Sequence, residues 1–150
     1  MKAKLPLCAN CLSLQAKKEE MRDYKKSIKV GAGIEDVYAA LTTPFAIELW
    51  SGYPAQMSAE AGSEFELWGG DICGRNLAFE ENKMVRQEWY LSEDAESILT
   101  IKLTARSNVR TEIYVVLTNI GDDAYGEVAT WMDETYVASL QQFLEEGDED

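Results

Sequence analysis

The chain has 150 residues, of which 46% are hydrophobic, and its formal net charge is −13 at pH 7. This length suits a single domain with a sizeable core, and the hydrophobic content is that of a globular protein rather than a disordered one. Such an acidic body repels phosphate, so no nucleic acid is expected as a partner. Every apolar run is shorter than the about 20 residues that span a bilayer, so no membrane role is expected.

The charge is distributed unevenly along the chain. Residues 1–30 carry eight Lys or Arg against three Asp or Glu, whereas the remainder carries six against 24. The first twenty residues also share no pattern with the rest of the chain. We therefore predict a basic N-terminal extension over residues 1–22 outside the core, one domain over 23–146, and an acidic tail over 147–150.

The domain begins with one predicted strand and two short helices. The side chains of residues 24–30 alternate between two faces as in a β-strand, and the glycines within residues 31–33 end this strand. Apolar residues at helical spacing predict an amphipathic helix over 34–42. Pro44 is acceptable at the first position of a second helix, which Gly52 closes. Phe45, Leu49 and Trp50 give this second helix an apolar side.

The next part of the chain consists of segments in which apolar and polar residues alternate, and short turns separate these segments. A parallel return would need a crossover of a dozen residues or more, so these short turns require antiparallel pairing. The predicted strands are 63–68, 72–79, 84–91, 97–105 and 110–118, and a further short strand near 55–59 is left open.

A long helix is predicted from Gly121 to about residue 145, with Gly147 as its stop. Its apolar stripe runs from Tyr125 to Phe143 and must be buried against a large partner, for which the concave side of the sheet is suitable. The predicted fold class is therefore α+β: a curved antiparallel sheet wrapped around a long C-terminal helix, with two short helices after the first strand.

The sequence has little of the usual catalytic chemistry. It contains no histidine, which excludes His-based triads and His-metal sites, and it has no phosphate-binding loop. Cys8 and Cys11 have the C-x-x-C spacing but no second ligand pair, so no metal is expected; a zinc ion shared between two copies is left open. Cys73, within a strand, is expected to act as a small buried hydrophobe. Three cysteines without an export signal indicate a reducing, cytoplasmic location.

Carboxylates are the remaining candidates for acid–base work. Glu64 and Glu66 share one strand face, and Glu88 lies on another strand. Paired carboxylates act as acid and base when they are buried. The favoured interpretation is that they lie on the solvent face and pair with the arginines and lysines of neighbouring strands, as exposed charges commonly do. No catalytic residue, cofactor or enzymatic activity is therefore predicted.

A long helix over a curved sheet can leave an apolar cavity with a few polar anchors, as ligand sites usually have. The same aromatic residues can instead pack on one another as core, and both alternatives stay open. The candidate lining residues are Trp50, Phe65, Trp68, Trp89, Val128, Trp131, Met132 and Tyr136. The candidate polar anchors are Arg86, Tyr90 and Tyr114.

Several short motifs, in this order and spacing, resemble the activator of heat-shock-protein-90 ATPase homologue family, a branch of the START-like (SRPBCC) helix-grip superfamily. The motifs are residues 37–44, Leu49-Trp50, 61–65, Gly74, Glu88-Trp89 and Thr130-Trp131. The resemblance covers about residues 24–145. The chain departs from the family at Ser63, where a second glycine is usual, and at residues 80–82, where a proline is usual. The eukaryotic activators also carry a separate N-terminal domain that supplies much of the chaperone contact, which twenty residues do not replace.

The absence of histidine, of a phosphate-binding loop and of a metal cluster favours a binding role over catalysis for this fold. The leading hypothesis is a non-catalytic module that binds a small hydrophobic molecule in the cavity or a protein partner. The alternative is a co-chaperone-like protein that modulates a heat-shock-protein-90-type ATPase. Proteins made of this domain alone resemble a broad bacterial group, and a homodimer is left open.

Overall fold

The structure, a computed structural model, describes residues 20–91 and 96–148. Its strands form one six-stranded antiparallel sheet in the order β1-β6-β5-β4-β3-β2. The strands are β1 (Met21–Val30), β2 (Glu64–Leu67), β3 (Ile72–Glu80), β4 (Met84–Trp89), β5 (Ser97–Ser107) and β6 (Arg110–Gly121). The helices are α2 (Ile34–Thr42), α3 (Pro44–Ser51), η1 (Trp68–Gly70), α4 (Asp122–Trp131), η2 (Met132–Tyr136) and α5 (Val137–Asp148).

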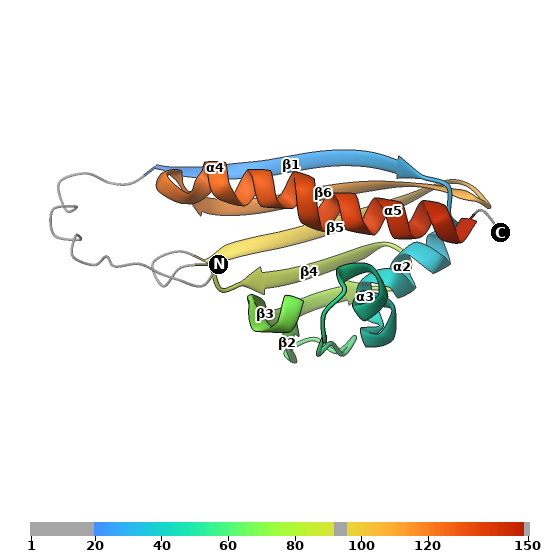
Figure 1. Ribbon diagram of the computed structural model, residues 1–150, viewed down its shortest axis with the longest axis horizontal. Helices are drawn as coiled ribbons and strands as arrows, with labels where there is room; N and C mark the ends of the chain where they lie inside the picture. The colour runs from blue at the N-terminus through green and yellow to red at the C-terminus, as the bar shows by residue number, and fades with distance from the viewer. Residues whose placement is uncertain (1–19, 92–95, 149–150) are drawn as a thin grey trace, which may run out of the picture.

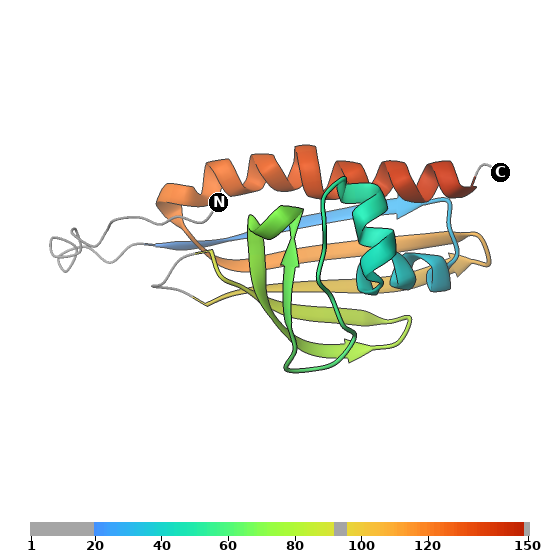
Figure 2. The ribbon, with the colours of Figure 1, turned by 60° about the horizontal axis from the view of Figure 1, so that its bottom comes forward.

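The long C-terminal helix lies along the concave face of the sheet, and α2 and α3 pack beside α5 at one end (Figures 1 and 2). This arrangement confirms the predicted α+β fold class. The core lies between the sheet and the helices, where strand residues such as Val85, Leu99 and Ile113 meet helix residues such as Leu140 and Leu144, all at most 3% exposed. We call the opposite face of the sheet, turned away from α4 and α5, the outer face.

Some element boundaries differ from the predicted ones. β1 begins at Met21 and β6 continues to Gly121, because these two ends pair with each other in the sheet. The strand left open near 55–59 is a single bridge between Gln56 and Glu66. Gly52 ends α3 in a left-handed conformation (φ 84°), as its position predicted.

The long helix contains a π-helical turn, η2, which the sequence pattern did not predict. Asp133 of this turn accepts a 2.5 Å hydrogen bond from the Tyr24 hydroxyl and forms an ion pair with Lys26 at 3.6 Å. Burial and the adjacent Asp133 carboxylate both raise the pKa of Tyr24, so this phenol stays protonated and donates. The π turn is thereby fastened to β1.

Charge is segregated between the helices and the sheet. Within the described parts of the chain, every lysine and arginine lies on a strand or on the β3–β4 turn, and no helix carries one. The helices instead carry acidic residues, for example Glu35 and Asp36 on α2, Glu48 on α3 and Glu127 on α4. The helix side of the molecule is therefore acidic, whereas the sheet carries the cations.

Candidate functional site

The interior is organised around Tyr136, at the end of the π turn. Its ring centroid lies 5.4 Å from that of Trp50, 5.7 Å from Trp68, 5.6 Å from Trp89 and 6.2 Å from Trp131. These are all four tryptophans of the chain, and they come from α3, η1, β4 and α4. We call these five residues the tryptophan cluster. Its rings are at contact distances, so they fill much of the space between sheet and helix.

Two of the indole N–H groups in the cluster are bonded to the protein. Trp50 Nε1 donates to the carbonyl of Ala40 at 2.9 Å, which fixes α3 against α2. Trp89 Nε1 donates to Gln87 Oε1 at 2.9 Å. Trp50 and Trp89 are therefore oriented by hydrogen bonds as well as by packing.

The bond from Trp89 continues as a buried polar chain. Gln87 Nε2 donates to Asn76 Oδ1 at 3.0 Å, and Asn76 Nδ2 donates to Ser63 Oγ at 3.0 Å and to the Ser58 carbonyl at 3.1 Å. Asn76 and Gln87 are 0% and 3% exposed. This chain links β4 and β3 to the loop before β2, and it satisfies polar groups whose burial would otherwise be costly.

The Tyr136 hydroxyl differs from these groups. Tyr136 is 3% exposed, yet its hydroxyl has no hydrogen-bond partner among the described residues. Burial raises the pKa of Tyr136 above its ordinary value, so the phenol stays neutral.

The eight candidate lining residues come together in the structure. Phe65, Val128 and Met132 belong to the same buried core as the tryptophan cluster. Trp131 is the most accessible of the five cluster residues, since it is only partly buried. Whether they enclose a ligand remains a proposal, because the rings pack against one another.

The three candidate polar anchors lie elsewhere. Arg86 and Tyr114 are on the outer face, and Tyr90 follows β4 and is 46% exposed. The cause is the alternation of a strand: Trp89 faces the core, so Arg86 and Tyr90, at odd spacings from it, face outwards. The sequence alone left the facing of these strands undetermined, and the prediction put these side chains on the wrong side for a cavity.

The candidate acid–base carboxylates and Cys73 lie on the outer face of the sheet. Glu88 forms an ion pair with Arg75 at 3.4 Å, and Glu64 and Glu66 are exposed on β2, in agreement with the solvent-face interpretation. Cys73 is only partly buried, because it faces outwards on β3. Across the described ranges, no group of residues suits a metal ion. Cys8 and Cys11 lie outside the described residues.

Sequence reasoning missed one surface, on α3. Phe45, Leu49 and Tyr53 are 68%, 57% and 53% exposed, although the sequence placed the first two with Trp50 on one apolar side of this helix. The residues that face the core are Ile47 and Trp50. Phe45 and Leu49 are four residues apart and share a helix face, which we call, together with Tyr53, the α3 patch.

Comparison with known proteins assigns the family. Residues 32–145 match the family described as Activator of Hsp90 ATPase homolog 1-like protein. The chain belongs to this family. The match covers the two short helices, the strands from β2 to β6 and most of the long helix, which are the elements that surround the tryptophan cluster.

Similar proteins agree with this assignment. The chain is 27% identical over 114 residues to an uncharacterised protein of Schizosaccharomyces pombe. The aligned region covers 67% of this chain but only 34% of that protein. The chain thus spans about a third of this relative's length. Among solved structures, a Mesorhizobium loti protein is 25% identical with a TM-score of 0.73, covering 85% of this chain and 99% of that one. An Hsp90 activator from Plasmodium falciparum is 16% identical with a TM-score of 0.68, covering 77% and 91%; it shares the fold.

Among the described helices, none combines the length and the apolar character that crossing a membrane requires.

Proposed function

We propose that this chain is a cytoplasmic, non-catalytic module that binds a partner protein through the α3 patch. The observation that carries the proposal is the exposure of Phe45 and Leu49 on α3, whose other face is packed in the core, and of Tyr53 just after the helix. Each of the three side chains is more than half exposed. Large apolar side chains grouped on a surface are typical of protein interaction sites, and aromatic residues are enriched there.

The charge around the patch specifies the partner's chemistry. Glu48 lies on α3 itself, Glu35 and Asp36 lie on the neighbouring α2, and no described helix offers a cation. A complementary surface is therefore basic at its rim and apolar at its centre. The acidic helix side would also steer a basic partner towards the patch during encounter.

The first partner to test is a heat-shock-protein-90-type ATPase. The family description and the Plasmodium falciparum relative both refer to activation of this chaperone. The chain spans only part of its curated relative, so the proposal concerns binding by this domain and does not extend to the activity of a larger protein.

The test is a pair of substitutions in the α3 patch. We expect Phe45→Ser with Leu49→Ser to weaken binding to the purified chaperone at least tenfold, on the order of 1.4 kcal/mol or more, because exposed apolar anchors dominate interface energies. Isothermal titration calorimetry measures the affinity, and the chaperone's ATPase rate reports modulation. Tyr114→Ser, which removes an exposed aromatic ring from the outer face, is the matched control. Equal binding by the double variant and the wild type would rule out the patch as the docking site.

A second candidate function is supported by the unpartnered Tyr136 hydroxyl. A small apolar molecule with one acceptor would satisfy this group, although it would have to displace rings that are now in contact. If this function is correct, native mass spectrometry of the purified protein should show a retained hydrophobic molecule of defined mass. The same spectrum reports whether the chain forms a homodimer. A spectrum with the bare chain mass alone would leave the tryptophan cluster as core.

A further inference from the structure

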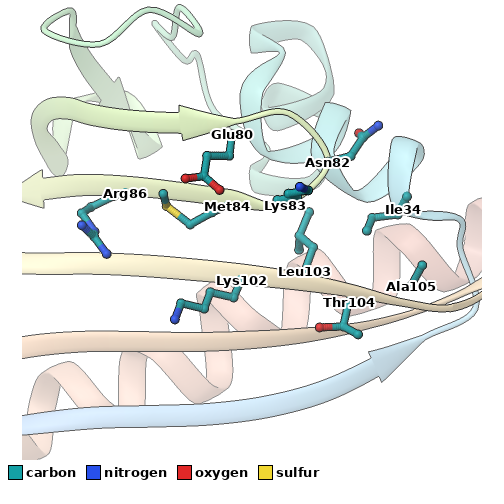
Figure 3. Close-up of a pocket in the computed structure, with 10 residues that line it drawn as sticks. All are labelled: Ile34, Glu80, Asn82, Lys83, Met84, Arg86, Lys102, Leu103, Thr104 and Ala105. Atoms are coloured by element: carbon teal, nitrogen blue, oxygen red, sulfur yellow. The ribbon is translucent and has the colours of Figure 1, made fainter.

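The sheet contains a notch where two neighbouring strands differ in length. Pairing between β4 and β5 ends at Met84 and Lys102, after which the amide of Leu103 still donates to the Lys83 carbonyl at 2.9 Å. β5 then continues to Ser107 without β4 beside it. An open hollow of about 670 Å³ lies at this point, between the end of the β3–β4 hairpin, β5 and the start of α2 (Figure 3). We call it the hairpin notch.

The notch combines apolar and cationic groups. Ile34, Met84, Leu103 and Ala105 supply apolar surface. The cationic lining residues are Lys83, Arg86 and Lys102, and the one lining carboxylate is that of Glu80. Four of the ten lining residues are therefore apolar and four are charged, so the notch offers contacts both to an apolar body and to a charged group.

The three cations are available to a ligand. Lys83, Arg86 and Lys102 are all exposed, and none of them forms an ion pair with a carboxylate of the described residues. Arg86 donates to Thr100 Oγ1 at 3.3 Å, which holds its side chain over the sheet and leaves its other N–H groups free to bind. An excess of positive charge is notable on a chain whose net charge is −13.

The overall charge decides between two kinds of anionic ligand. At physiological salt the Debye length is about 8 Å, so a small anion in the notch is influenced mainly by the lining charges, which are three cations against the one carboxylate of Glu80. An acidic protein would cover more of the surface and would approach a molecule that is acidic overall. The observations therefore favour a small molecule over an acidic protein.

We propose that the hairpin notch binds a small organic anion with an apolar body. Its phosphate or carboxylate group lies against Arg86 and Lys102, which face the same side of the sheet, and its apolar part lies over Met84. Arginine provides planar, bidentate recognition of such groups. This site is separate from the α3 patch and from the tryptophan cluster, and it does not depend on the proposed function.

The experiment is a titration of ¹⁵N-labelled protein with 2-naphthyl phosphate, with neutral 2-naphthol as the matched probe. We expect the largest amide shift changes at Lys83, Met84 and Leu103, and an affinity at least tenfold higher for the phosphate than for the naphthol. The preference should shrink as salt is raised, because the rim charges are exposed. Equal affinity for the two probes, or changes centred on Trp131 and Tyr136, would overturn the proposal.

Paired variants locate the anion. Arg86→Gln with Lys102→Gln should weaken 2-naphthyl phosphate binding about tenfold, since it removes two charged contacts. Lys25→Gln with Lys29→Gln removes the same charge from β1, whose lysines do not line the notch, and should change affinity less than about twofold. All four residues are exposed, so urea unfolding should confirm that both variants fold. Equal weakening by the two pairs, or tighter competition by a twelve-residue polyglutamate peptide, would refute a small-anion site.

Discussion

Replacing Gly74 with alanine is expected to lower the free energy of unfolding by about 3 kcal/mol, near the upper end of the usual cost of overpacking. Gly74 lies on β3 opposite Trp89, where a β-carbon would meet the Glu88 carbonyl oxygen at 1.9 Å and Phe65 Cζ at 3.0 Å. The backbone oxygen cannot move aside without separating β3 from β4. Urea unfolding followed by tryptophan fluorescence measures the loss, because Trp89 reports directly on this contact.

Gly126→Ala is the matched control for this prediction. Gly126 lies within α4, and a β-carbon there would meet no atom within 4 Å. Alanine is the better helix former by about 0.8–1.0 kcal/mol, so this variant should be more stable than the wild type. If both glycine variants unfold at the same urea concentration, the close approach of β3 and β4 at Gly74 is wrong.

The second large effect is expected at Tyr136. Tyr136→Ala removes the ring that contacts all four tryptophans, and the loss of a buried aromatic ring costs about 3–5 kcal/mol. We therefore expect the free energy of unfolding to fall by about 4 kcal/mol. The near-ultraviolet circular dichroism of the tryptophans should also weaken, since four indoles lose a common neighbour.

Tyr136→Phe separates the ring from its hydroxyl. No described residue bonds to this oxygen, so its removal should change stability by less than about 0.5 kcal/mol. A loss above about 1 kcal/mol would show that the hydroxyl has a partner, which would remove the support for a ligand in the core. The comparison of Ala and Phe at one position thus tests both the packing and the second candidate function.

The order of elements could be predicted from the sequence because most elements have a clear period and clear ends. The predicted end of the long helix was wrong, since α5 continues past Gly147 to Asp148. In the strands after β2, inward-facing and outward-facing residues alternate, and the short turns between these strands require antiparallel pairing. Gly52 and Gly121 lie at helix ends. It was harder to predict which face of the sheet an individual side chain occupies. Arg86 could have been placed outwards by counting from Trp89, but this requires knowing that Trp89 faces the core.

The α3 patch and the hairpin notch depend on tertiary structure. α3 is apolar on both sides, since Ile47 and Trp50 form one face and Phe45 and Leu49 the other, so the period alone does not decide which face is buried. The notch arises because β5 extends past the start of β4. Strand pairing of this kind is not visible in either segment when it is considered alone.

The π turn has a consequence for how the long helix tolerates changes in length. The buried residues of the long helix recur at every fourth position, a spacing longer than the 3.6 residues of an α-helical turn. They are Val128, Met132, Tyr136, Leu140 and Leu144. A π turn takes up about one surplus residue, which keeps both halves of such a stripe on the sheet. In a regular helix, losing one residue rotates everything after it by about 100°. Here η2 can release its surplus residue instead, so deleting one residue within η2 is expected to leave α5 with the same face on the core.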